Sequence, residues 1–144
     1  MISKLDIKDI DSFNRIGLLV NKNFVNLFKL EYIIDSKDED VYGYYDNDKL
    51  VGFIHILKTF ECLEIINVVV DTDYRKKGIA TKLIDYLNEC YDDVEYILLE
   101  VNEKNSNAIN LYNKLGFNVI NVRKKYYGND DALIMRREVN VWKM

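Results

Sequence analysis

The sequence has 144 residues, among them one histidine, two cysteines and no proline. With His55 as the single histidine, the chain has few candidate ligands for a zinc site and only one candidate base for a Ser-His-Asp triad, so we expect no metal site. The two cysteines, Cys62 and Cys90, lack a C-x-x-C spacing. We expect both to be small, unreactive side chains of the core in a reducing compartment.

Long apolar runs are also missing from the chain. No stretch approaches the roughly 20 apolar residues that cross a bilayer. The first residues, MISKLDIKDIDSF, alternate charges with hydrophobic side chains instead of forming a signal-peptide core. We therefore expect a cytoplasmic protein with no membrane partner.

The charge balance is acidic, with 24 acidic against 20 basic residues and a formal net charge of −4. A general nucleic-acid binder is usually basic along one face, so we expect no nucleic-acid partner. Hydrophobic residues make up 49% and charged residues 31% of the chain, which suits a compact domain with a substantial core. Since no internal repeat or low-complexity tract interrupts it, we expect one domain over residues 1–144.

Hydrophobic periodicity predicts an α/β domain around a mixed sheet, in the order β-α-α-β-β-β-α-β-α-β-β. In chain order the expected elements are a strand at 1–5, helices at 10–20 and 24–34, a hairpin within 41–57 around the turn at 46–48, a strand within 61–71, a helix from 78 or 79 to about 92, a strand at 95–101, a helix within 105–117, and strands at 117–127 and 131–142. Asn105 or Ser106 can cap the last helix, and Gly116 stands at its C-terminal end. Residues 65–70 are nearly all apolar and are expected to be buried on both faces, and 95–101 is expected to be a further buried strand.

Three consecutive cations, Arg75, Lys76 and Lys77, stand just before the third predicted helix. A helix N-terminus carries partial positive charge and unpaired backbone N–H groups, so cations are mildly destabilising there. A strand that runs into a glycine loop at a helix start presents those N–H groups to an anion. Gly78 and Ala80 are small enough to let a ligand approach. The pattern predicts a site for a pyrophosphate or a sugar phosphate, and a solvated basic loop is the alternative.

The same stretch, VVVDTDYRKKGIATKLIDYL, resembles the acetyl-CoA-binding motif of the Gcn5-related N-acetyltransferases (GNAT), Arg/Gln-x-x-Gly-x-Gly/Ala. The resemblance extends from about residue 50 to 135, and its Asp71-Thr72 step departs from the usual Asp-Pro. It implies the GNAT fold, an acetyl-CoA-dependent acyltransferase, a strand end that pairs with the pantetheine arm, and a loop that holds the pyrophosphate. The implied cofactor contacts are Val68, Val69, Val70, Arg75, Lys76, Lys77, Gly78, Ile79, Ala80, Thr81 and Asn105.

A second stretch, LLEVNEKNSNAINLYNKLGF, resembles the RimI-like branch of that family, which acetylates protein N-terminal amines, especially on a small-subunit ribosomal protein. By this resemblance Glu100 is the general base and Tyr112 the general acid. The chemistry needs such groups in any case, because the acceptor ammonium must lose a proton and the departing thiolate must gain one. Backbone N–H groups near Val69 and Val70 are candidates for holding the oxyanion. A solvated Glu100 and a core Tyr112 are the ordinary structural alternatives.

A third stretch, RKKYYGNDDALIMRR, resembles the C-terminal hairpin of the same branch. The resemblance implies that Tyr126 and Tyr127 border the groove that receives a peptide N-terminus. The N-terminal third, in contrast, lacks the Pro-Trp that the branch often carries between its first two helices. This region shapes the acceptor pocket in the family, so the departure bears on the choice of acceptor and not on the transfer reaction.

Three alternatives remain open at the level of sequence. The first is the same reaction on a lysine side chain or on a small amine, such as a polyamine, an amino sugar or an amino acid. Residues 35–40, Asp130 and Asp131 offer acidic groups that could attract a cationic acceptor. A non-catalytic coenzyme A sensor is another. Nucleotide binding is disfavoured because neither G-x-x-x-x-G-K-[ST] nor G-x-G-x-x-G is present. A monomer and a homodimer fit the sequence equally.

Overall fold

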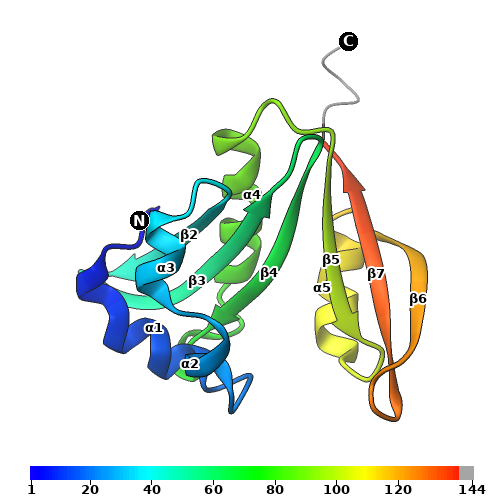
Figure 1. Ribbon diagram of the computed structural model, residues 1–144, viewed down its shortest axis with the longest axis horizontal. Coiled ribbons are helices and arrows are strands. Elements are labelled where there is room, and N and C mark those ends of the chain that lie inside the picture. Colours follow the sequence, from blue (N-terminus) through cyan, green and yellow to red (C-terminus); the bar gives the residue numbers. More distant parts are fainter. Residues whose placement is uncertain (140–144) are drawn as a thin grey trace. The chain divides into compact units, whose positions relative to one another are not determined.

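The computed structural model describes residues 1–139 (Figure 1). Its strands are β1 (Ile2–Lys4), β2 (Glu39–Asp46), β3 (Lys49–Lys58), β4 (Cys62–Val70), β5 (Tyr96–Asn102), β6 (Asn118–Tyr127) and β7 (Asp130–Glu138). Its helices are α1 (Ile10–Gly17), α2 (Phe24–Leu27), α3 (Leu30–Asp35), α4 (Ile79–Cys90) and α5 (Ser106–Lys114), with 3₁₀ turns at Ile7–Asp9 and Thr72–Tyr74. The strand order β1-β2-β3-β4-β5-β7-β6, with β4 and β5 parallel, confirms the predicted α/β class and mixed sheet. The expected strand residues 140–142 lie outside the described part of the chain.

Backbone contacts divide the chain into two compact units, and β4 contributes to both. The first unit contains Met1–Leu57 and Asn67–Cys90, and the second contains Lys58–Ile66 and the chain from Tyr91 onward. The single domain expected over residues 1–144 stays a prediction. Within residues 1–139, no helix has the length and apolar character that a membrane crossing needs.

The core of the first unit is built around three phenylalanines. The rings of Phe13 and Phe53 have centroids 4.6 Å apart, and Phe24 lies 5.1 Å from Phe13 and 5.9 Å from Phe53. All three side chains are fully buried. They join α1 and α2 to the inner face of β3, whereas α4 lies on the opposite face of these strands (Figure 1). The hairpin between β2 and β3 is confirmed, and its turn residues Asn47 and Asp48 both have positive φ, as a type I′ turn requires.

The single helix predicted over 24–34 is wrong, because the chain breaks between α2 and α3. Phe28 (φ −129°, ψ 104°) and Lys29 (φ −103°, ψ 110°) are extended. Phe24 and Leu30 are both fully buried in the same core. In one continuous helix, at about 100° per residue, these two side chains would point about 120° apart around the helix axis. The break lets both reach the core, so three short helices replace the two expected.

The first helix also ends earlier than predicted, at Gly17 instead of near residue 20. A Cβ at Gly17 would lie 2.1 Å from the Phe24 ring, so the helix end packs directly against α2. Val20, which the sequence predicts within this helix, is 55% exposed. Helix α4 buries Ile79, Leu83, Ile84 and Leu87, whereas Cys90 is exposed, so the expectation of two core cysteines holds for Cys62 alone.

Burial of residues 65–70 on both faces, expected from their composition, is also wrong. Only Ile65 and Val69 are buried, at 6% and 4% exposure, and their neighbours are partly exposed. The register of β4 with β5 runs from Cys62 opposite Tyr96 to Ile65 opposite Leu99. Burial on both faces needs packed elements above and below the strand. Ile65 and Val69 are four positions apart and lie on one face, so the other face of this stretch has no fully buried side chain.

Strand β5, also expected to be buried, is buried on one face only. Alternate side chains, Ile97, Leu99 and Val101, are inside, and those between them are partly exposed. Helix α5 follows as predicted: the Asn105 side chain caps it by accepting the Ala108 N–H at 3.2 Å, and Gly116 (φ +91°) ends it. Because only alternate residues of β5 are buried, the side chains between them form a partly exposed row on the other face of this strand.

Candidate active site

The loop from β4 to α4 belongs to the first unit and contains the three predicted cations. Lys76 (φ +63°) and Gly78 (φ +78°) both adopt the left-handed conformation. A Cβ at Gly78 would meet no protein atom within 4 Å. Glycine is therefore needed there for its backbone angle, and the space beside it is open to a ligand.

The start of α4 offers backbone donors to an anion. The first intrahelical bond of this turn runs from the Lys82 N–H to the Gly78 carbonyl, at 3.0 Å. The N–H groups of Ile79, Ala80 and Thr81 precede it and have no intrahelical acceptor. The first turn of α4 contains no acidic side chain, and the Ile79 side chain itself is buried. These groups fit a pyrophosphate, and Ile79 can contribute only through its backbone.

Two of the three cations contact the loop itself. The Arg75 Nε donates to the Val70 carbonyl at 3.0 Å, which ties the loop to the end of β4. The Lys77 ammonium lies 5.3 Å from the centre of the Tyr74 ring, and Lys49 approaches the same ring at 5.5 Å. The structure thus places all three predicted cations in one loop, at the helix start that the sequence indicated.

An ion pair that the sequence did not reveal fixes the start of this loop. The Arg15 guanidinium in α1 lies 3.0 Å from the Asp71 carboxylate, which also accepts the Thr72 N–H at 2.8 Å. The hydrogen bond from Arg15 lowers the pKa of Asp71, and its charge and the Thr72 N–H act in the same direction. The Asp71 N–H in turn donates to the Val51 carbonyl at 2.8 Å. Asp71 therefore anchors the loop to both α1 and β3.

Gly52 in β3 is a second residue that the sequence reading missed. A Cβ there would stand 3.1 Å from the Val69 carbonyl oxygen and 3.4 Å from Ile79 Cγ2. The strand interior needs glycine so that β3 can approach the end of β4 and the first residue of α4. Glycine inside an otherwise apolar strand is the signal that would have indicated this close approach.

The second unit contains a polar cluster around Glu100. The Glu100 carboxylate in β5, 23% exposed, lies 3.0 Å from the Arg123 guanidinium in β6. Arg123 in turn lies 5.4 Å from the centre of the Tyr126 ring. The rings of Tyr126 and Tyr127 meet edge to face, with centroids 5.1 Å apart. The structure thus brings three predicted site residues together and adds Arg123, which the sequence reading did not single out.

The register of the strands explains why these side chains share a face. Glu100 is opposite Ile134, and Arg123 and Asn102 are both opposite Ala132, so they lie on neighbouring rows of one face. Burial raises the pKa of the Tyr127 hydroxyl, and the nearby Glu100 charge raises that pKa further. Tyr127 therefore lies within electrostatic range of Glu100 and stays a neutral phenol at neutral pH.

Tyr112, the predicted general acid, lies in α5. It is 9% exposed, and its ring meets the Phe117 ring at 5.9 Å. Burial raises the pKa of its hydroxyl, so it too is protonated at neutral pH. Within residues 1–139, no hydrogen bond or ring contact joins Tyr112 to Glu100. Its catalytic role, like the coenzyme A contact expected of the helix-capping Asn105, stays a prediction.

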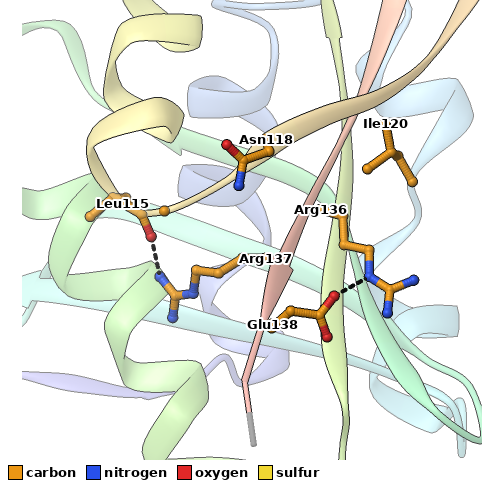
Figure 2. A pocket seen from close by; sticks show the side chains of 7 residues that line it. Leu115, Asn118, Ile120, Arg136, Arg137 and Glu138 are labelled. Carbon is orange, nitrogen blue, oxygen red and sulfur yellow. Dashed lines mark hydrogen bonds and ion pairs between the residues drawn. The ribbon is translucent and has the colours of Figure 1, made fainter. Parts of the chain in front are cut away.

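The second unit also has a pocket of about 410 Å³ beside the end of α5 (Figure 2). Its charged groups already have partners: the Arg137 Nη1 donates to the Leu115 carbonyl at 3.2 Å, and Arg136 pairs with Glu138. Neither Glu100 nor the tyrosine pair lines it. This pocket is therefore separate from the candidate site.

Comparisons with known proteins agree with the geometry. A sequence profile of the "Acetyltransferase (GNAT) family" matches residues 14–117. The chain is 32% identical over 101 residues to the "[Ribosomal protein bS18]-alanine N-acetyltransferase" of Escherichia coli (strain K12), covering 66% of this chain and 68% of that one. It is 32% identical over 145 residues to an "N-alpha-acetyltransferase" of Saccharolobus solfataricus, covering 92% and 87%.

Solved structures show the same fold. The ribosomal-protein-S18-alanine N-acetyltransferase from Escherichia coli superposes with a TM-score of 0.84 at 24% identity, over 96% of this chain and 93% of that one. The aminoglycoside 6'-N-acetyltransferase from Enterococcus faecium superposes with a TM-score of 0.78 at 18% identity, over 96% and 97%.

Proposed function

Because the chain belongs to the GNAT acetyltransferase family, we propose that its acceptor is the α-amine at the N-terminus of a protein. As a family member it is an N-acetyltransferase, and acetyl-CoA is its cofactor. Two kinds of relative support the acceptor: one is named for an alanine of ribosomal protein bS18, and the other is named an N-alpha-acetyltransferase. A terminal alanine of a small-subunit ribosomal protein is accordingly the first substrate to test.

The loop before α4 fits the cofactor. The N–H groups of Ile79, Ala80 and Thr81 would bind the pyrophosphate, and Lys76 beside them would neutralise its charge. The open space beside Gly78 leaves room for this approach. Val68, Val69 and Val70 would pair with the pantetheine arm through their backbone. When bound, acetyl-CoA supplies the thioester that the acceptor amine attacks.

Proton transfer is assigned to residues of the second unit. Glu100 would accept a proton from the acceptor ammonium, and the neutral amine so formed would attack the acyl carbon with its lone pair. Arg123 holds that carboxylate in one orientation. As the carbon–sulfur bond breaks, the neutral Tyr112 hydroxyl would give a proton to the departing thiolate. No covalent acyl-enzyme is required, so Cys62 and Cys90 take no part.

The observation that carries the acceptor proposal is the cluster of Glu100, Arg123 and the tyrosine pair. The two phenol rings give a peptide backbone apolar walls and hydroxyl groups beside the carboxylate. A small cationic amine is less well supported, since Asp130 and Asp131, the two acidic groups of this unit proposed to attract it, already have partners. Asp130 accepts the Asn102 amide N–H at 3.3 Å, and Asp131 pairs with Lys124 at 3.4 Å.

The acid–base chemistry favours an α-amine over a lysine side chain. With pKa values of about 7.8 and 10.4, roughly one α-amine in seven is neutral at pH 7, against about one lysine in 2,500. A single carboxylate base therefore has a far smaller deprotonation cost to overcome for an N-terminal amine than for a lysine side chain.

The direct test is to incubate the protein with acetyl-CoA and a peptide that begins with alanine. Mass spectrometry should show the gain of one acetyl group on the terminal amine, and a thiol assay should show release of coenzyme A. The matched control is the same peptide with a blocked terminus and a free lysine. Modification of the lysine alone, or of small amines alone, would overturn the proposed acceptor and leave the family assignment intact.

A further inference from the structure

Strand β6 contains an irregularity immediately before the tyrosine pair. Arg123 is opposite Ala132, and Tyr127 is opposite Asp130, so β6 advances four positions where β7 advances two. Lys125, inside this bulge, has φ +53°, a conformation that costs a non-glycine residue roughly 1–2 kcal/mol. A bulge also removes backbone groups from the ladder of hydrogen bonds. Other hydrogen bonds must therefore stabilise the conformation of this segment of β6.

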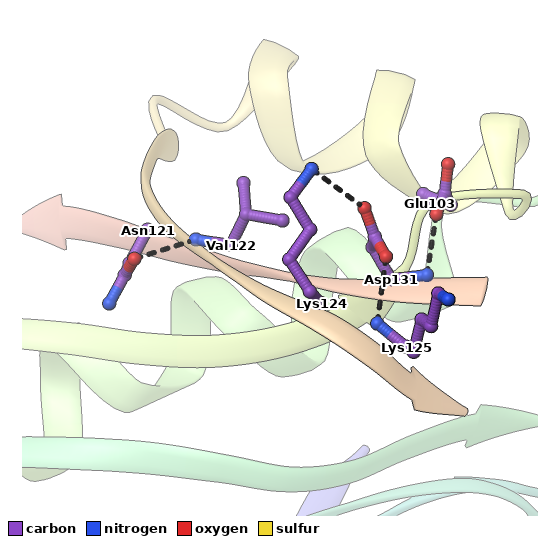
Figure 3. Close-up of polar contacts among 6 residues, drawn as sticks. All are labelled: Glu103, Asn121, Val122, Lys124, Lys125 and Asp131. Carbon is purple, nitrogen blue, oxygen red and sulfur yellow. Dashed lines mark hydrogen bonds and ion pairs between the residues drawn. The ribbon is translucent and has the colours of Figure 1, made fainter. Parts of the chain in front are cut away.

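Asp131 in β7 is that support (Figure 3). Its carboxylate accepts the Lys125 N–H at 2.8 Å and pairs with the Lys124 ammonium at 3.4 Å. The Asp131 backbone is itself fixed, because its N–H donates to the Glu103 carboxylate and its carbonyl accepts the Glu103 N–H at 3.0 Å. One residue thus connects the bulge of β6 to β7 and to the turn that leads into α5.

The bulge accounts for the arrangement of the two tyrosines. In a regular strand, consecutive side chains point to opposite faces, so neighbouring rings do not meet. The rings of Tyr126 and Tyr127 nevertheless lie 5.1 Å apart at 81°. Tyr126 also contacts Arg123, which holds Glu100. The turn at Lys125 brings both rings to the side where Glu100 lies.

We propose that Asp131 is a positioning residue for the acceptor: its carboxylate holds the β6 bulge that places Tyr126 and Tyr127 beside Glu100. The inference rests on the proposed function, because it takes the tyrosine pair as the acceptor's binding surface. Asp131 does not itself contact the acceptor. It alternates with Asp130, which is opposite Tyr127, and so its side chain points to the other face of the hairpin.

The test compares steady-state kinetics of four variants with the wild-type enzyme, using acetyl-CoA and the alanine-starting peptide. Asp131→Ala should raise the peptide KM at least tenfold and change the affinity for acetyl-CoA less than twofold. Asp131→Asn keeps an oxygen that can accept the Lys125 N–H and should stay within threefold of wild type. Asp131→Glu keeps the charge but displaces the carboxylate by one methylene group, so it should raise the peptide KM even if the alanine variant fails to fold.

The control is Lys124→Ala, which removes the ion pair and leaves the bond to the Lys125 N–H intact. It should keep the peptide KM within twofold of wild type. Amide hydrogen exchange adds a direct readout: the Lys125 N–H should exchange at least tenfold faster in Asp131→Ala than in Lys124→Ala.

Three results would be adverse. A wild-type enzyme that acetylates no peptide terminus would refute the proposed function before any variant is made. With an active wild type, an unchanged peptide KM in both Asp131→Ala and Asp131→Glu would overturn the role of Asp131. Equal effects of Asp131→Ala and Lys124→Ala would overturn it as well, because the ion pair alone would then explain the loss.

Discussion

The Glu100 carboxylate lies 3.0 Å from the Arg123 guanidinium, so the proposed base is held by a residue of the neighbouring hairpin. Both side chains share a face of the second unit with Tyr127. If Glu100 is the base, this ion pair favours one orientation of its carboxylate toward the acceptor ammonium. This makes Glu100 the residue whose removal separates chemistry from cofactor binding.

We expect Glu100→Gln to lower kcat by about 10²–10⁴-fold, the usual contribution of a positioned proton acceptor. The affinity for acetyl-CoA, measured by calorimetry, should stay within twofold, because the predicted cofactor loop lies elsewhere in the sequence. The exposed Glu95, just before β5, provides the matched control, and Glu95→Gln should be fully active. An active Glu100→Gln enzyme would show that another group, or water, accepts the proton.

The glycine of the cofactor loop permits a paired test. Gly78 and Gly128 both have φ +78°, and a Cβ at either position meets no protein atom within 4 Å. Alanine should therefore cost a similar 1–2 kcal/mol of backbone strain at each site. Only Gly78→Ala should also weaken acetyl-CoA binding, by about tenfold, because its Cβ would enter the space that we propose for the pyrophosphate. Equal acetyl-CoA affinities of the two variants would argue against this loop as the cofactor site.

The ion pair between Arg15 and Asp71 should matter for both stability and cofactor affinity. Because Arg15 is half exposed, we expect Arg15→Met to lower the free energy of unfolding by only about 1 kcal/mol. The pKa of Asp71 is depressed in the folded state, so this stability is present above the unfolded pKa and is lost as pH falls through the folded pKa. Denaturant titrations at neutral pH and at pH 3 should show the variant's deficit shrinking in acid.

The pair of Lys4 and Asp40, at 3.2 Å with an exposed lysine, is the control for that experiment. Lys4→Met should change stability by less than about 0.5 kcal/mol. It should also leave acetyl-CoA affinity unchanged, whereas Arg15→Met should weaken it. A deficit of Arg15→Met that stays constant from pH 7 to pH 3 would contradict the assigned role of the Asp71 carboxylate.

Features determined by neighbouring residues were predictable from the sequence. The turn at Asn47 and Asp48, the left-handed Gly78 at a helix start and the cap at Asn105 each depend on a few consecutive residues. Local chemistry of this kind can be read from a short window. The turn and the helix cap are confirmed where the sequence predicts them, and the cofactor role of the loop at Gly78 stays a prediction.

Features that depend on partners distant in sequence were not predictable. Arg15 and Asp71 are 56 positions apart, and nothing near either residue indicates the pair. The break between α2 and α3 allows both Phe24 and Leu30 to be buried in one core. Helix propensity describes each residue locally and gives no information on this tertiary packing. The bulge at Lys125 likewise depends on Asp131 in the next strand. The site residues that the sequence did not indicate, such as Arg15 and Asp131, are therefore those that bind other side chains or loops through contacts distant in sequence.

His55 gives a last prediction, on the pH dependence of stability. It is 1% exposed, and its Nε2 lies 2.8 Å from the Glu39 carboxylate. Burial lowers the pKa of His55 below its usual value near 6.5, and the Glu39 hydrogen bond only partly opposes that shift. The unfolded chain therefore binds a proton more readily than the folded protein. Below about pH 6.5, stability should fall by up to about 1.4 kcal/mol for each pH unit as the unfolded state takes up that proton.

The variant His55→Gln retains a hydrogen-bonding side chain but cannot titrate. Denaturant unfolding at pH 7.5 and pH 5.5 should show a smaller loss of stability for this variant than for the wild type, whatever its absolute stability. Both measurements stay above the range in which carboxylates titrate, so the difference reports His55. If the two proteins lose the same stability across this interval, the buried imidazole is not the group responsible, since no other histidine is present in the chain.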